Sequence, residues 1–137
     1  MNEKNFKIKA IKAREIFDCR GYPTIEVDVI TEGGVIGRAS APAGRSKGKY
    51  EALELRDGGK RLEGFGVLKA VSIANETIAT LLQGMDVRHQ KEIDSVMIEY
   101  DGTENKSRLG GNVMIATSLA VARAAANALS LPLYKYI

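Results

Sequence analysis

The residues best suited to chemistry lie in one loop, where cations, glycines and a hydroxyl group occur together. Residues 44–48 read Gly-Arg-Ser-Lys-Gly, and the cations of this stretch are Arg45, Lys47 and Lys49. Glycines let a backbone approach a ligand closely, and clustered cations favour an oxyanion. Pro42 and the two glycines also mark the segment as a loop. The sequence therefore predicts an anion-binding loop, with a simple solvated loop as the alternative.

A nucleotide-binding P-loop does not fit this segment. The P-loop motif needs four residues between its glycines and a Ser or Thr directly after its lysine. Here three residues separate Gly44 from Gly48, and Tyr50 follows Lys49. We therefore expect a small anion as the ligand of this loop, and not a nucleotide held in a P-loop.

The remaining reactive side chains form no recognisable site in the sequence. His89 is the only histidine and Cys19 the only cysteine, so neither a Ser-His pair nor a metal site has support. The carboxylates are scattered, without the spacing of a metal cage, and we expect them to pair with nearby cations on solvated faces. Glu54 with Arg56 is one such pair.

Length and composition predict one soluble, cytoplasmic domain over residues 1–137. Hydrophobic residues make up 45% of the chain and charged residues 27%, as in an ordinary globular protein. A single cysteine excludes an internal disulfide and fits a reducing cytosol. No signal peptide is visible, and the alanine-rich stretch 113–129 is too short for a bilayer, so no membrane contact is expected. A net charge of +3 and an aromatic content of 6% argue against nucleic acid as a partner.

The elements that must position the loop begin with three strands. Residues 7–13 alternate polar and apolar, with a change of phase by one residue at Ile11. Residues 24–29 alternate strictly and predict a half-buried strand, and residues 35–41 follow a tight turn at 32–34. The connections are too short for a parallel crossover, which predicts an antiparallel meander.

Helical spacing takes over after the loop. Apolar residues from Val67 to Leu82 predict a first helix that stops near Gly84. Asp86 is a good N-cap for a second helix. The face of that helix is predicted to carry Ile93, Met97 and Tyr100. Residues 110–130 predict an alanine-rich, buried third helix. Strands followed by helices predict an α+β fold, with a three-stranded antiparallel meander followed by a helical bundle and no (β/α)₈ barrel.

Several segments match, in order, the landmarks of one family. Residues 13–27 are similar to the pattern A-R-x-I-x-D-S-R-G-N-P-T-V-E-V, and residues 42–57 to P-S-G-A-S-T-G-x-x-E-A-L-E-x-R-D. Residues 101–110, 118–125 and 131–134 match later landmarks. Together these segments resemble the N-terminal domain of enolase (phosphopyruvate hydratase), and the resemblance covers nearly the whole chain.

The resemblance implies an activity as well as a fold. Enolase, a lyase of glycolysis, dehydrates 2-phosphoglycerate to phosphoenolpyruvate and uses Mg²⁺ to stabilise an enolate. Its general base, acid glutamates and metal carboxylates belong to a (β/α)₈ barrel, which needs about 250 residues. The N-terminal domain contributes a lid, and by resemblance Ser46 is the lid serine that reaches the second Mg²⁺. Arg14 and Glu26 match positions that pair with the partner subunit's barrel in enolase dimers.

The lid departs from the family pattern around its serine. Where the family has Ser, Ala and Thr, this chain has Ala43, Arg45 and Lys47. Two long cations beside Ser46 would crowd the space and repel Mg²⁺ by about 1–4 kcal/mol per close pair. In the turn near residue 20, Tyr22 replaces the usual Asn.

These observations lead to three hypotheses. The first is an enolase-like N-terminal domain that is non-catalytic by itself, with no cofactor of its own. It would bind an anionic small molecule through the basic lid, or self-associate, and its lid residues are Gly44, Arg45, Ser46, Lys47 and Gly48. The second is the N-terminal piece of a Mg²⁺-dependent enolase that supplies the lid to a barrel chain. The third is a small RNA-binding module.

Overall fold

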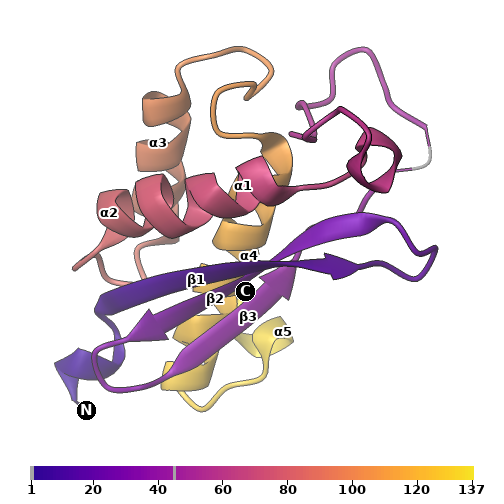
Figure 1. The fold of residues 1–137 in the computed structure, drawn as a ribbon. Coiled ribbons are helices and arrows are strands. Elements are labelled where there is room, and N and C mark those ends of the chain that lie inside the picture. The colour runs from indigo at the N-terminus through magenta and orange to yellow at the C-terminus, as the bar shows by residue number, and fades with distance from the viewer. Residues whose placement is uncertain (1, 45) are drawn as a thin grey trace.

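Three antiparallel strands form a sheet, and the helices pack against one of its faces (Figure 1). The computed structural model describes residues 2–44 and 46–137. Strand β1 spans Ile8–Phe17, β2 spans Pro23–Thr31 and β3 spans Ile36–Ser40, in the order β1-β2-β3. This order confirms the predicted meander, and the helices that follow it confirm the α+β class.

A β-bulge near the start of β1 explains the change of phase in the sequence pattern. Ile8 pairs with Thr31 and Ala10 pairs with Ile30, so a step of two residues along β1 matches a step of one along β2. An extra residue in one strand shifts its alternation by one position. Ile8 and Ile11 are therefore both buried although they lie three residues apart.

The central strand β2 is buried more deeply than the predicted half-buried strand. Ile25, Val27 and Val29 are fully buried on the helix-covered face, as their alternation predicts. Asp28 points to the opposite face and is still only 5% exposed. Its burial arises because arginine side chains from β1 and β3 lie against it, which alternation within one strand cannot reveal.

The first predicted helix is present, but it is not a uniform α-helix. It runs as α1 (Leu68–Ser72), the π-helical segment η3 (Ile73–Ile78) and α2 (Ala79–Leu82), and it packs against β1. Gly84 follows with a left-handed φ of 82° and is the predicted stop. The fully buried positions of the helical run 68–82 recur every four residues, at Ala70, Ala74, Ile78 and Leu82.

The second helix begins later than predicted. Helix α3 spans Gln90–Asp101, and Asp86 does not cap it. The Asp86 carboxylate instead accepts a hydrogen bond from the backbone N–H of Arg88 (2.8 Å) and pairs with its guanidinium (2.6 Å). Asp86 therefore closes a turn ahead of the helix, and the predicted N-cap is wrong. Two residues of the predicted face are buried, whereas the third, Tyr100, is 42% exposed.

The alanine-rich helix lies at the centre of the core, as predicted. Helix α4 spans Gly111–Ala128 and packs across β2 and β3, and the short α5 (Leu133–Tyr136) follows it. Gly37 of β3 approaches α4 so closely that a Cβ at this position would lie 2.2 Å from the carbonyl oxygen of Ala120. Small side chains on both elements thus bring the helix into direct contact with the sheet.

Two 3₁₀ turns complete the described chain. Turn η1 spans Glu3–Asn5 before β1, and η2 spans Arg61–Gly64 before α1. The Arg61 guanidinium donates to the Glu15 carboxylate of β1 (2.5 Å), which attaches η2 to the sheet. Across the described residues, no helix has the length and apolar character needed to cross a membrane.

Candidate functional site

The predicted lid, residues 42–57, follows Ala41 at the end of β3, and its described residues form neither helix nor strand; we call residues 41–57 the lid loop. Its first end is fastened to β2. The Ala41 backbone N–H donates to the carbonyl of Ile25 (3.1 Å), and the buried Thr24 hydroxyl donates to the carbonyl of Ala41 (2.6 Å). The outgoing limb, the part of the lid loop that follows β3, is therefore held in place where it begins.

The returning limb of the lid loop is fastened to the start of α4. The Asn112 side chain accepts a hydrogen bond from the backbone N–H of Leu55 (3.0 Å) and donates one to the carbonyl of the same residue (3.1 Å). The Gly111 backbone N–H donates to the carbonyl of Leu53 (2.7 Å). One buried side chain thus satisfies both backbone groups of Leu55, as a neighbouring strand would.

Two glycines let the returning limb come this close to α4. Gly110 has a left-handed φ of 94°, and a Cβ there would lie 2.8 Å from the Cβ of Leu55. At Gly111 a Cβ would lie 2.7 Å from the Cβ of Ala52. A side chain at either position would push the limb away. Sequence reasoning used these glycines only to place the start of a helix and missed their contact with the lid loop.

Asp101 holds the loop that follows α3, and this loop contacts the lid loop. It is 1% exposed, and its carboxylate accepts hydrogen bonds from the backbone N–H of Leu109 (2.7 Å) and from Thr103. Burial raises the pKa of Asp101, but these hydrogen bonds outweigh burial and leave the pKa below its ordinary value. The backbone carbonyl of Asn105, in the loop held by Asp101, accepts a hydrogen bond from the backbone N–H of Leu53 (2.7 Å). Sequence reasoning treated this carboxylate as one more surface group.

Four of the five predicted lid residues lie at the tip of the lid loop and face solvent. The exposed residues there include Gly44, Ser46, Lys47 and Gly48. Arg45, the fifth predicted lid residue, lies outside the described residues. The structure therefore groups the other four beyond both attachments of the loop, where movement of the tip would not disturb the anchors.

A carboxylate within the lid loop offsets part of its positive charge. Glu54 Oε2 lies 3.4 Å from Lys47 Nζ and 3.3 Å from Arg56 Nη2, so the predicted pairing of Glu54 with Arg56 is present. Arg56 also donates to the carbonyls of Pro23 (2.7 Å) and Phe65 (2.6 Å). The repulsion that Lys47 would exert on a cation near Ser46 is reduced by this carboxylate.

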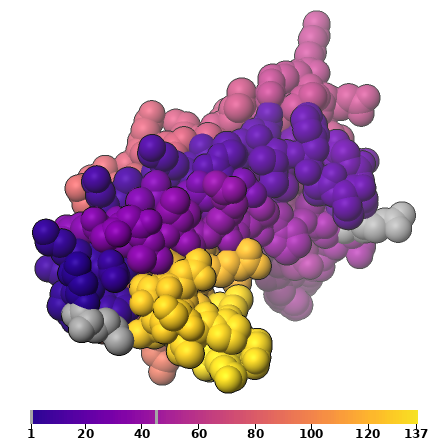
Figure 2. Space-filling model, turned by 90° about the horizontal axis from the view of Figure 1, so that it is seen from below, coloured from indigo at the N-terminus to yellow at the C-terminus, as the bar shows by residue number. Residues whose placement is uncertain are grey.

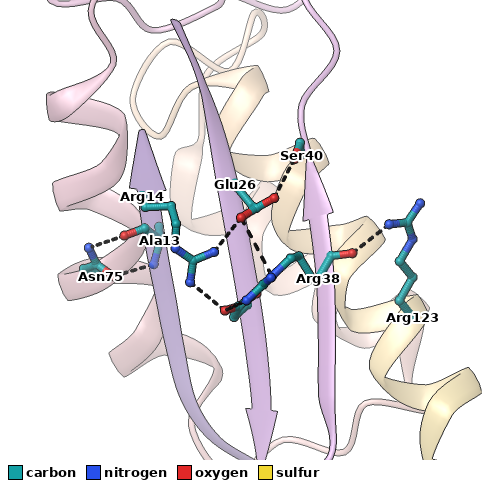
Figure 3. Close-up of polar contacts among 8 residues, drawn as sticks. Ala13, Arg14, Glu26, Arg38, Ser40, Asn75 and Arg123 are labelled. Atoms are coloured by element: carbon teal, nitrogen blue, oxygen red, sulfur yellow. Dashed lines mark hydrogen bonds and ion pairs between the residues drawn. The ribbon is translucent and has the colours of Figure 1, made fainter. Parts of the chain in front are cut away.

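The predicted interface residues meet on the outer face of the sheet (Figure 3). Arg14 lies 2.7 Å from Glu26 and 2.5 Å from Asp28. Arg38 donates two hydrogen bonds to Asp28 (2.6 and 2.9 Å), and the Ser40 hydroxyl donates to Glu26 (3.3 Å). These five residues, which we call the sheet-face cluster, place two guanidiniums and two carboxylates across all three strands.

The sheet-face cluster lies on a face that the helices leave open. Figure 2 shows indigo and purple atoms of the strands on this side of the molecule, with the yellow C-terminal end beside them. The Arg14 and Arg38 side chains are 37% and 58% exposed, whereas the Asp28 side chain is 7% exposed. Hydrogen bonds from Arg38 and Arg14 lower the pKa of Asp28 to about 2, against the effect of burial. The carboxylate is therefore charged at neutral pH.

The described residues do not build a metal site by themselves. Among them, no three His, Cys, Asp or Glu side chains are placed to hold a metal ion. Mg²⁺ takes about six oxygen ligands, usually with carboxylates among them, and Ser46 offers one neutral hydroxyl. Ser46 therefore fits as one ligand of an ion whose carboxylates come from elsewhere. His89 Nδ1 lies 3.4 Å from Glu92 Oε2 on the surface, and Cys19 is exposed.

The fold is an α+β domain made of a meander and the helices behind it, with one long loop fastened to both. A family model described as "Enolase, N-terminal domain" matches residues 8–137. The chain belongs to the family of enolase N-terminal domains, which confirms the resemblance seen in its motifs.

Individual relatives support the same assignment. The enolase of Pyrococcus furiosus is 58% identical over 135 residues, and that of Thermococcus gammatolerans is 59% identical over 135 residues. Enolase 2 of Lactiplantibacillus plantarum is 57% identical over 130 residues. These alignments cover 98%, 98% and 95% of this chain but only 31%, 31% and 30% of the relatives. The chain therefore spans about a third of the length of the curated relatives it matches.

Proposed function

We propose that residues 1–137 act as one domain, the lid-bearing N-terminal domain of a Mg²⁺-dependent enolase. Together with a (β/α)₈ barrel, the domain would serve the dehydration of 2-phosphoglycerate to phosphoenolpyruvate. The observation that carries this proposal is the lid loop, whose two ends are fastened to β2 and α4 while Ser46 stands at its exposed tip. The identity of 58% to the enolase of Pyrococcus furiosus supports the same role.

In this proposal, some residues of the lid loop's surroundings anchor its two ends, and the residues of its tip move. Thr24 and Asn112 hold the two limbs, so closure is confined to the tip between them. Gly44 and Gly48 give that tip the backbone freedom that closing requires. A closed tip excludes water from the reacting groups, and the Ser46 hydroxyl would face the metal. When bound, Mg²⁺ would supply the positive charge that stabilises an enolate.

The sheet-face cluster supports a role in assembly. Arg14 and Glu26 already pair with each other at 2.7 Å on the open face, so their charges are held in a fixed geometry. We propose that this face meets the partner subunit's barrel, where a carboxylate could approach Arg14 and a cation Glu26. Electrostatic matching of this kind fixes the register of an interface.

A domain exchange tests the proposed function. The segment of Pyrococcus furiosus enolase that aligns with this chain is replaced by residues 1–137, and formation of phosphoenolpyruvate from 2-phosphoglycerate is followed with Mg²⁺ present. We expect turnover well above that of the enolase lacking its N-terminal segment. We also expect Lys47→Thr, which restores the family residue, to lower the Mg²⁺ concentration that half-saturates the rate.

The opposite outcome would favour the rival functions. A folded chimera with no turnover beyond that of the barrel alone would overturn the proposed lid role. In that case a non-catalytic binding module would become the leading account, and steep salt-dependent retention of RNA would identify the RNA-binding alternative.

A further inference from the structure

A hollow of about 280 Å³ lies between the β1–β2 turn and the lid loop. The turn contributes Arg20 and Tyr22, the lid loop contributes Lys47 and Arg56, and Phe65 closes one side. We call this space the turn hollow. Its walls come from three segments that are separate in sequence, so a molecule within it would contact the turn and the lid loop at once.

Aromatic rings hold the guanidinium groups of the turn hollow in place. The Tyr22 and Phe65 rings meet edge to face with centroids 5.2 Å apart. The Arg20 guanidinium lies 5.3 Å from the Tyr22 centroid, and the Arg56 guanidinium lies 5.8 Å from the Phe65 centroid. Stacking on a ring restrains an arginine without consuming its N–H donors. Tyr22 stands where the motif that this chain resembles has Asn, which has no ring for such a contact.

The turn hollow carries a net positive charge. Its lining contains three cations and the single carboxylate of Glu54, which gives +2 in total. Glu54 is shared between Lys47 and Arg56, so these two cations are partly neutralised. Arg20 pairs with a different carboxylate, that of Asp18 at 3.7 Å, and its side chain is 31% exposed, more than that of Arg56 and less than that of Lys47.

Arg20 retains donors for a further ligand. Its Nη2 donates to the carbonyl of Ala43 (3.0 Å) and makes the ion-pair contact with Asp18. A guanidinium carries five N–H groups, and among the described residues Nε and Nη1 of Arg20 have no hydrogen-bond acceptor. These two nitrogens lie on different edges of the guanidinium, so each can donate singly to an oxygen of a carboxylate or a phosphate.

We propose that the turn hollow binds a small oxyanion, a phosphate monoester or a carboxylate, with Arg20 as its main contact. The site joins Gly44 and Lys47 of the tip to Arg20 of the turn, and all of its lining residues belong to this domain. A bound anion would connect Arg20 to Lys47, and so restrain the lid loop against the turn. The inference thus adds a ligand site to the domain beyond the proposed lid function.

Calorimetric titration of residues 1–137 tests the site with three probes: inorganic phosphate, phenyl phosphate and acetate. We expect phenyl phosphate to bind more tightly than inorganic phosphate because its ring can rest against Tyr22 and Phe65. Acetate separates a carboxylate site from a phosphate site, since only the former would retain it. Arg20→Gln should weaken binding about tenfold or more, because it removes a charged hydrogen-bond donor.

Two further variants test whether the charge of the turn hollow controls binding. Glu54→Gln should strengthen binding severalfold, because it raises the net charge of the lining and releases Lys47. Lys91→Gln removes an exposed cation of α3, away from the turn hollow, and should leave binding unchanged. Circular dichroism confirms that each variant is folded. The proposal fails if no probe binds, if Glu54→Gln weakens binding, or if Lys91→Gln acts as strongly as Arg20→Gln.

Discussion

The side chain of Asn75 closes the outer edge of β1 at Ala13 (Figure 3). Its Oδ1 accepts a hydrogen bond from the Ala13 backbone N–H (2.7 Å), and its Nδ2 donates to the carbonyl of the same residue (3.2 Å). At the other edge, Arg123 donates to the carbonyl of Arg38 and Asn127 to the carbonyl of Ile36, both at 2.8 Å. Helix side chains thus occupy both edges of the sheet and disfavour strand addition there. The open, charged face is the surface that we propose for assembly.

Removing the Asn75 carboxamide should expose this edge. We expect Asn75→Ala to destabilise the domain by about 1 kcal/mol, because two hydrogen bonds to Ala13 are lost. Amide exchange at Ala13 should become faster, and light scattering should show self-association through the freed edge. Glu76→Ala alters the neighbouring exposed position and serves as the control. Unchanged exchange at Ala13 in the Asn75 variant would contradict the assigned role.

The stability of the domain should depend on pH through Asp28. Its folded pKa of about 2 lies below the ordinary 3.8, so its stabilising contribution is complete above about pH 4 and lost as the pH falls toward 2. The shift corresponds to about 2 kcal/mol. Urea unfolding of the wild type and Asp28→Asn should therefore differ most near neutral pH and converge in acid. Glu99→Gln, an exposed control on α3, should show no such convergence, and a constant difference for Asp28→Asn would refute the linkage.

Asn112 should control the returning limb of the lid loop. Asn112→Ala leaves the backbone N–H and carbonyl of Leu55 without their partner, at a cost of about 1–3 kcal/mol. Amide exchange at Leu55 should rise by a larger factor than exchange in the sheet. Asn127→Ala removes another asparagine of α4, and it should leave Leu55 protected. Equal effects of the two variants on Leu55 would mean that Asn112 does not anchor the loop.

Gly37 should tolerate no side chain. A Cβ at this position would lie 2.2 Å from both the carbonyl oxygen of Ala120 and the backbone N of Ala124, and backbone atoms cannot move aside cheaply. We expect Gly37→Ala to lower the free energy of unfolding by about 1–3 kcal/mol or more, as overpacking does. Chemical denaturation gives the value. Gly48→Ala meets only ordinary contacts of 3.7 Å and longer, so a comparable loss there would show that the clash is not the cause.

Patterns within single segments predicted most of the fold. The phase change near Ile11 marks a real bulge, and the alanine-rich stretch is the buried helix α4. Prediction from neighbouring residues failed where one side chain could form either of two interactions. Asp86 has the chemistry of an N-cap, but Arg88 lies two residues away and takes its carboxylate, so the helix starts at Gln90.

The candidate site was predicted only in part, because its supports join distant segments. The motif placed Ser46 and Lys47 in the lid, and the structure gathers the described lid residues at one tip. The bond of Asn112 to Leu55 spans 57 residues, and the arginines that bury Asp28 come from other strands. Neither contact leaves a periodic or compositional signal in either segment. The roles of these residues therefore required the three-dimensional arrangement.

The most direct test of the lid is the rate of the chimeric enolase with and without the Ser46 hydroxyl. We expect Ser46→Ala to reduce the turnover of 2-phosphoglycerate by about 10²–10³, the loss typical of removing one group that stabilises charge in the transition state. The matched variant Ser95→Ala, on the exposed surface of α3, should retain the parent rate. A Ser46→Ala chimera as active as the Ser95→Ala chimera, at every Mg²⁺ concentration, would contradict the central claim that this loop closes over the metal.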